Sequence, residues 1–153
     1  ENIYNGAFSY SERLTSVKLP STLKFLDVGA FGDCTGLTTI NIPPKMKTHD
    51  TTAANRQWPG PFYGCKNLKN VTLDNGMEEV PRGIFYAPSG DIGLEEIVIP
   101  DSVKWIGYSA FFGCKNLKKV TLSKKLEELS RADRKRILET MNFLIVQAGG
   151  KSE

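Results

Sequence analysis

Hydrophobic and polar positions recur along this chain in a pattern that is repeated five times with variations. In each copy a Leu follows a Phe after a short segment, a Val or Ile comes three positions later, and a further Leu or Ile comes two positions after that. The copies begin at Phe8, Phe31, Phe62, Phe85 and Phe111, so they are spaced 23, 31, 23 and 26 residues apart. A period in this range predicts a solenoid, a stack of small units that bury their apolar faces against one another.

The extra residues of the longer copies are confined to two segments. About eight lie between Met46 and Phe62, which we interpret as an insertion over residues 47–61, and three lie between Phe85 and Leu94. In a solenoid such segments bulge outward as loops and leave the stack intact.

The last residues of each copy alternate with a period of two, which predicts a β-strand. Successive copies would pair these strands in parallel as a sheet on one face of the solenoid. The inward positions are Val17, Leu19, Ile40, Ile42, Val71, Leu73, Ile97, Ile99, Val120 and Leu122. The outward positions are Ser16, Lys18, Thr39, Asn41, Asn70, Thr72, Glu96, Val98, Lys119 and Thr121.

A short segment around each Phe returns the chain toward the next strand, and we expect it to form a single helical turn. A Gly stands two positions before Phe in four copies, and Ser109 takes this place in the fifth. A positive φ or a helix start would explain both residue types. The Phe residues would then form a continuous buried column, the main spine of the core.

The end of the chain departs from the repeat. Apolar residues recur with a helical period after Ser130, and Gly149 and Gly150 end the run, which predicts an amphipathic helix over about 131–148. The predicted organisation is a solenoid over residues 1–129, followed by a capping helix and tail over 130–153 that cover the last repeat.

The composition is that of an ordinary soluble domain. The 153 residues are 40% hydrophobic and 24% charged, and no stretch reaches the length of a transmembrane segment. A net charge of +3, dispersed along the chain, does not indicate nucleic-acid binding. Because the chain opens in the middle of a repeat, we interpret it as part of a longer protein, whose export signal would lie upstream. The uncovered first repeat would expose an apolar edge and allow self-association.

The segment from Ile106 to Leu117 reads Ile-Gly-Tyr-Ser-Ala-Phe-Phe-Gly-Cys-Lys-Asn-Leu and is the clearest copy of the motif. This pattern, over about residues 3–129, resembles the BspA-like leucine-rich repeat family. The resemblance implies an α/β leucine-rich repeat solenoid of five repeats, with the parallel sheet on one face and short helical turns opposite. It also implies a secreted or surface-displayed, adhesin-like protein, typically bacterial, with no catalytic residues to carry over.

Candidate chemistry for catalysis is scarce. His49 is the only histidine and lies in the insertion without a partner positioned to make it a general base. Cys34, Cys65 and Cys114 each stand three residues after a repeat Phe, so we interpret them as a buried structural column. A disulfide between Cys34 and Cys65 remains an alternative. The sequence shows no metal, cofactor or nucleotide motif, and we expect no enzyme.

Three surfaces could bind a partner. The first is the outward face of the sheet, the second is the insertion with Trp58, and the third is the basic start of the final helix, which a solvated cap also explains. From the first two we predict as binding residues Lys18, Asn41, Asn70, Thr72, Glu96, Val98, Lys119, Thr121 and Trp58.

The sequence therefore predicts a non-catalytic module that binds a protein or glycoprotein outside the cell. An alternative is a structural spacer or docking platform in a larger protein whose activity lies upstream. A third interpretation is carbohydrate binding by Trp58 with Tyr63.

Overall fold

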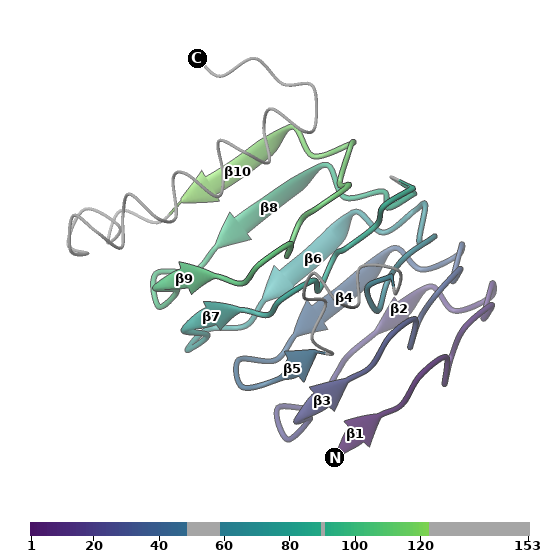
Figure 1. Ribbon diagram of the computed structural model, residues 1–153, viewed down its shortest axis with the longest axis horizontal. Coiled ribbons are helices and arrows are strands. Elements are labelled where there is room, and N and C mark those ends of the chain that lie inside the picture. The colour runs from purple at the N-terminus through teal and green to yellow at the C-terminus, as the bar shows by residue number, and fades with distance from the viewer. Residues whose placement is uncertain (49–58, 90, 123–153) are drawn as a thin grey trace.

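The computed structural model describes residues 1–48, 59–89 and 91–122. These residues wind into five successive turns of a solenoid, and one strand from each turn lies in a row (Figure 1). We call these the longer strands, because four of them have four residues each, although the first has two. The row consists of β2 (Ser16–Val17), β4 (Thr39–Ile42), β6 (Asn70–Leu73), β8 (Glu96–Ile99) and β10 (Lys119–Leu122). These are the strands that the period-two pattern predicts, and their hydrogen-bonded neighbours are parallel.

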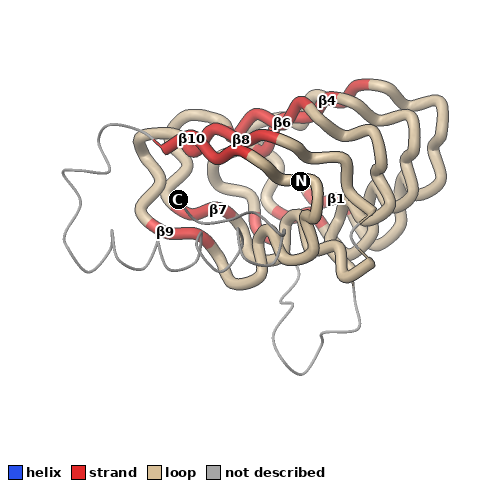
Figure 2. Tube along the Cα trace, turned by 90° about the horizontal axis from the view of Figure 1, so that it is seen from above, coloured by secondary structure: helices blue, strands red, loops and turns tan. Residues whose placement is uncertain are grey.

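A second row of short parallel strands lies on the opposite side of the solenoid (Figure 2). It contains β1 (Asn2–Ile3), β3 (Phe25–Leu26), β5 (Lys47–Thr48), β7 (Glu79–Val80) and β9 (Trp105–Ile106). The first row is the predicted sheet on one face, whereas the second row is not predicted from the sequence and lies where helical turns are expected. Two-residue strands are too short to show an alternation in the sequence.

This second row also narrows the predicted insertion over residues 47–61. Lys47 and Thr48 are not part of a loop, because they form β5 and pair with Phe25 and Leu26 of β3. At the other end of the segment, Gly60 and Pro61 are buried in the turn that precedes Phe62.

The core lies between the two rows and is lined by one stripe of residues per turn. In β4 the inward Ile40 and Ile42 are buried, and in β8 the inward Ile97 and Ile99 are buried. On the third side of the solenoid the repeat Phe rings stack, with centroid distances of 5.1, 5.6, 5.8 and 5.6 Å between neighbours from Phe8 to Phe111. This confirms the predicted Phe column, which is buried from Phe31 to Phe111, whereas Phe8 at its end is 46% exposed.

The segments around these Phe residues form hydrogen-bonded turns, and no helix occurs within the described residues. In the second turn of the solenoid, Ala30 N donates to Asp27 O at 3.2 Å and Gly32 N donates to Gly29 O at 2.7 Å. Gly29 belongs to both of these turns and has a φ of 56°. This positive angle interrupts the succession of negative φ angles that a helix requires. The expected helical turns are therefore not formed.

Of the two explanations that the sequence allows for the residue two positions before Phe, a positive φ angle or a helix start, the positive φ angle is found in four of the five copies. Gly6, Gly29, Gly83 and Ser109 have φ angles between 55° and 62°. Gly60 is the exception; a Cβ atom there would lie 2.5 Å from the carbonyl oxygen of Gly83, so close backbone approach explains this glycine.

Between the third and fourth turns, within the described residues, both rows of strands lose their pairing. β6 does not pair with β8, and β5 does not pair with β7. The backbone hydrogen bonds that cross this junction are Gly60 N to Tyr86 O at 2.8 Å and Gly93 N to Cys65 O at 3.1 Å. We call this junction the seam. The predicted capping helix over 131–148 lies outside the described residues.

Candidate binding surface

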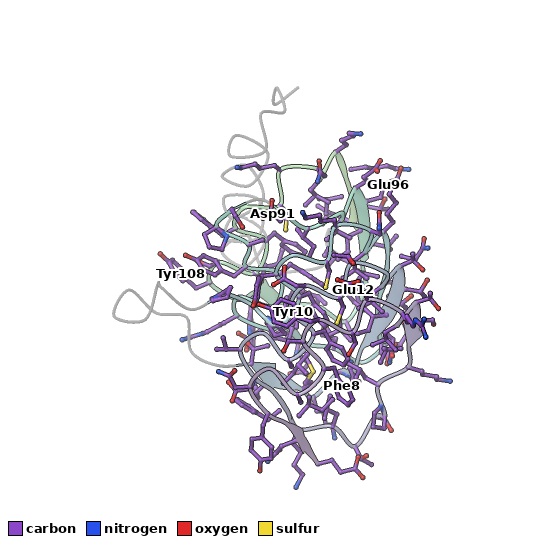
Figure 3. All side chains as sticks on the ribbon, turned by 90° about the vertical axis from the view of Figure 1, so that its right-hand side faces the viewer. Phe8, Tyr10, Glu12, Asp91, Glu96 and Tyr108 are labelled. Carbon is purple, nitrogen blue, oxygen red and sulfur yellow. The ribbon has the colours of Figure 1, made fainter. Side chains whose placement is uncertain are left out.

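Parallel pairing brings the predicted binding residues of the longer strands onto one outward face, which we call the sheet face. Its register places Asn41 beside Thr72, Glu96 beside Lys119, and Val98 beside Thr121. Within this set, the exposed residues are Lys18, Asn70, Thr72, Glu96, Val98, Lys119 and Thr121. Figure 3 shows Glu96 on the side of these strands, well away from Tyr108. Trp58, the remaining predicted binding residue, lies outside the described residues.

Asn41 differs from the other predicted residues of the sheet face because its side chain is occupied within the solenoid. Its Oδ1 accepts a hydrogen bond from Leu19 N at 2.7 Å, and its Nδ2 donates to Leu19 O at 3.1 Å and to Asp74 Oδ2 at 2.7 Å. The half-buried Asn41 thus links three successive turns. The sequence places Asn41 outward but does not reveal these partners, which come from 22 residues before it and 33 residues after it.

Charged side chains of opposite sign pair at the beginning of the longer strands. Glu95 contacts Lys69 Nζ at 2.8 Å and Lys118 Nζ at 3.5 Å, and Glu96 contacts Lys119 Nζ at 3.6 Å. The hydrogen bond from Lys69 and the charge of Lys118 lower the pKa of Glu95. These ion pairs are solvent-exposed and contribute little to stability. Their Glu and Lys side chains present alternating charge at one margin of the sheet face.

A hollow of about 720 Å³, which we call the sheet hollow, lies across the seam where β6 and β8 end. Val98, Thr72 and Thr121 line it on the strand side, and Asn75 and Ser102 line it from the turns that follow the strands. Val98 is 62% exposed, an unusual position for a valine. The hollow therefore combines an apolar centre with hydroxyl and amide groups around it.

A second hollow of about 670 Å³ lies on the side of the short strands, also across the seam. Its lining includes Met46, Lys47, Glu79 and Trp105, and the indole of Trp105 is partly exposed. Lys47 Nζ lies 3.8 Å from Glu79 Oε2. The sequence pattern does not single out Trp105 as a surface residue of interest. The feature that could have revealed it is an aromatic residue next to the buried Ile106, in a segment where no strand was expected.

Tyr63, the described member of the predicted carbohydrate pair, packs against the backbone of the second turn. A Cβ atom at Gly32 would lie 2.5 Å from its ring, so Gly32 makes room for it. Burial raises the pKa of the Tyr63 phenol, as do the nearby Asp33 carboxylate and Tyr10, with which it shares hydrogen bonds. Tyr10, labelled in Figure 3, is exposed beside it. Tyr63 thus has a clear packing role.

The cysteines form the buried structural column that the sequence predicts. The thiols of Cys34, Cys65 and Cys114 are free, and each donates to the carbonyl oxygen of a repeat Phe in the preceding turn, at 3.0, 3.1 and 3.4 Å. The alternative disulfide between Cys34 and Cys65 is not formed. Burial raises the pKa of Cys65 and of Cys114 to about 12, which suppresses the reactive thiolate. His49, the only histidine, lies outside the described residues.

The sequence profile of the BspA-type leucine-rich repeat region matches this chain in six copies, over residues 1–56 and 59–133. The chain belongs to this family. No curated protein sequence matches it. A helix with the length and apolar character needed to span a lipid bilayer is not found among the described residues.

Three solved structures are similar to this BspA-type repeat chain. A leucine-rich cell surface protein from Faecalibacterium prausnitzii is 23% identical over 80% of this chain and 34% of its own, with a TM-score of 0.44. A leucine-rich repeat protein from Eubacterium ventriosum is 22% identical over 76% of this chain and 34% of its own, with a TM-score of 0.39. A leucine-rich repeat protein from T. pallidum is 17% identical over 94% of this chain and 87% of its own, with a TM-score of 0.41. The chain spans about a third of the first two proteins.

Proposed function

We propose that this chain is a non-catalytic recognition module that binds a protein or glycoprotein through its sheet face. The observation that carries the proposal is the sheet hollow, where Val98 is 62% exposed among hydroxyl-bearing neighbours on a face of parallel strands. A rigid array of strands presents such a face without ordering a loop on binding, which reduces the entropic cost of association.

The arrangement of the sheet face resembles the general anatomy of a protein interface. Val98 with the methyl groups of Thr72 and Thr121 would supply an apolar centre, and the paired charges of Glu96 and Lys119 would form part of a polar rim. An apolar side chain that becomes fully buried by a partner is the type of contact that carries most of the binding free energy.

The family supports an extracellular role. BspA-like proteins are expected at the cell surface, where modules of this type bind molecules of a host or of neighbouring cells, and we propose the same adhesin-like role here. In this proposal Trp58 adds a contact from the insertion, and no residue of the chain acts in catalysis.

Two parts of the proposal concern the ends of the chain. We propose that the solenoid extends to residue 129 and that residues 130–153 cap it. Self-association through the first turn also stays a prediction; Phe8 is 46% exposed and Tyr4 is 66% exposed there.

The test is a binding assay of the whole chain against a defined panel of extracellular matrix and cell-surface glycoproteins. For a protein that is retained, Val98→Lys should weaken binding by about tenfold or more, which corresponds to about 1.4 kcal/mol. The control is Trp105→Ser, which alters a partly exposed apolar residue on the opposite side and should leave the affinity unchanged. A panel from which nothing is retained, or a loss of binding with Trp105→Ser alone, would overturn the proposal.

The alternative is that the chain serves as a spacer or docking platform in a larger protein. The exposed polar and apolar residues of the sheet face favour recognition over a spacer role, because a spacer needs no shaped hollow. A full-length protein whose catalytic domain binds to these repeats would support the platform instead.

A further inference from the structure

The chain contains two Asn-Gly steps, Asn5–Gly6 and Asn75–Gly76. We propose that Asn75 is a site of spontaneous deamidation and isoaspartate formation, whereas Asn5 is protected by the fold. An Asn followed by Gly is the dipeptide in which the side-chain amide is most open to attack by the next backbone nitrogen, because glycine has no side chain to hinder it.

The reaction requires only water. The backbone nitrogen of Gly76 forms a bond to Cγ of Asn75, the Cγ–Nδ2 bond breaks, and ammonia leaves with the proton of the backbone amide. The cyclic imide that results is then hydrolysed at either of its two carbonyl carbons. One product is an aspartyl residue in a normal backbone, and the other is an isoaspartyl residue whose chain continues through the side-chain carbon.

The structure leaves the attacking group at Gly76 free. Asn75 and Gly76 are both exposed in the turn between β6 and β7, and the N–H of Gly76 has no hydrogen-bond partner among the described residues. Gly76 has a φ of +87°, and a Cβ atom built on it would have nothing within 4 Å. Neither a hydrogen bond nor a neighbouring side chain therefore hinders the approach of this nitrogen to the Asn75 amide.

The Asn5–Gly6 step, although also exposed at its Asn, is held by its neighbours. Gly6 N donates to Val28 O at 3.2 Å in the next turn of the solenoid. Gly6 O accepts hydrogen bonds from Ser9 N at 3.0 Å and from Ser9 Oγ at 2.8 Å. Attack by the Gly6 nitrogen would require the bond to Val28 to break first. The chain thus contains a matched control for the same dipeptide.

The position of Asn75 gives the modification a structural consequence. Asn75 lines the sheet hollow, and Gly76 lines both hollows at the seam. Either product adds a carboxylate next to Asp74. The isoaspartyl product also adds one carbon to the backbone of a turn in which Met77 N donates to Asp74 O at 3.3 Å, and Met77 is buried. The modified turn cannot keep this geometry unchanged.

The experiment follows the whole native chain during incubation at mildly alkaline pH, where the backbone nitrogen is more readily deprotonated. Peptide mapping by mass spectrometry measures replacement of an NH group by oxygen at each site, and fragmentation that cleaves the backbone distinguishes aspartate from isoaspartate. Asn75 should convert about tenfold faster than Asn5, because Gly6 must first give up a hydrogen bond. In denaturant the two sites should convert at similar rates.

Equal rates at the two sites in the native protein would overturn the proposal, as would a tenfold difference that persists in denaturant. A variant gives an independent check. Asn75→Gln keeps an amide in the exposed turn but requires a larger ring for the same attack, so conversion at position 75 should fall below detection while Asn5 is unaffected. Undiminished conversion in this variant would contradict the proposed chemistry.

Discussion

At the scale of single residues, the Phe column shows how a repeated position becomes a source of stability. Phe31 is 1% exposed and stacks between Phe8 at 5.1 Å and Phe62 at 5.6 Å. Because each ring is buried by the turns before and after it, a single truncation leaves a cavity that neighbouring backbones cannot close. The contribution of a ring should therefore depend on whether it has neighbours on both sides.

We expect Phe31→Ala to lower the free energy of unfolding by about 3–5 kcal/mol. Phe8→Ala is the matched control. Because Phe8 is 46% exposed, this substitution should lower the free energy of unfolding by less than about half as much as Phe31→Ala does. Urea denaturation of both variants measures the difference. Equal losses would show that stacking in the column does not determine stability.

The cysteine thiols lead to a pH prediction at the same scale. The pKa of Cys65 rises from its ordinary value of 9.0 to about 12 because the thiol is buried, and it donates to Phe31 O at 3.1 Å. Below about pH 9 the thiol is protonated in both the folded and the unfolded chain, so its contribution to the free energy of unfolding is fully present. Above that pH the unfolded chain loses the proton while the folded chain keeps it, so stability falls as pH rises toward about 12.

Cys65→Ser should therefore make the alkaline loss of stability shallower, since a hydroxyl can donate to the same carbonyl but does not titrate in this window. Urea midpoints of the wild type and the variant, compared between about pH 8 and about pH 10, measure this effect. An equally steep decline in the two proteins would mean that Cys65 does not contribute to it.

These residue-scale features were largely predictable, because every buried column corresponds to one position of the repeat. Phe31, Cys65 and Ile97 lie where their phase in the repeat places them. Asn41 could not be interpreted in this way. Its phase is outward, and only the three-dimensional arrangement brings Leu19 and Asp74 within reach of its side chain.

At the scale of elements, Asn41 extends the contact between β2 and β4. The backbone pairing of β2 with β4 covers Ser16 and Val17, whereas β4 pairs with β6 through four residues. Beyond Val17, the side chain of Asn41 replaces the missing ladder by bonding both the N–H and the carbonyl oxygen of Leu19. The side chain therefore acts as part of the sheet.

Asn41→Ala should lower the free energy of unfolding by about 1–3 kcal/mol, because it leaves the half-buried groups of Leu19 without partners. Thr72→Val is the control. Thr72 is the register neighbour of Asn41 and is exposed, so removal of its hydroxyl should change stability by less than about 0.5 kcal/mol. Thermal or urea unfolding measures both. A loss with Asn41→Ala that is no larger than with Thr72→Val would show that these hydrogen bonds add nothing.

The elements that sequence reasoning missed share a physical cause. The strands of the short row have two residues each, and three of the five turns around Phe have positive φ angles on both sides, as at Gly29 and Asp33. Neither feature gives a hydrophobic period of its own, because the apolar residues there follow the repeat and not a local helix or strand. Repeat phase predicts burial well, but it does not predict local backbone conformation.

At the scale of the whole molecule, the seam divides the described solenoid into two blocks. Turns one to three are joined by the ladder β2–β4–β6, and turns four and five are joined by the ladder β8–β10. In a repeat protein stability is the sum of the units and their interfaces, so the interface with the fewest hydrogen bonds opens most readily. The Phe62–Phe85 contact crosses the seam with the longest centroid distance in the column, 5.8 Å.

We therefore expect the two blocks to open separately in native-state hydrogen exchange. Ile40 and Ile97 occupy the same repeat position in different blocks and are 1% and 2% exposed. Each Ile→Val substitution removes one methyl group and should cost about 0.5–1.5 kcal/mol. Ile97→Val should accelerate amide exchange in β8 and β10 while β2 and β4 exchange at the wild-type rate, and Ile40→Val should do the reverse. If either substitution accelerated exchange in all five longer strands equally, the seam would not separate two cooperative units.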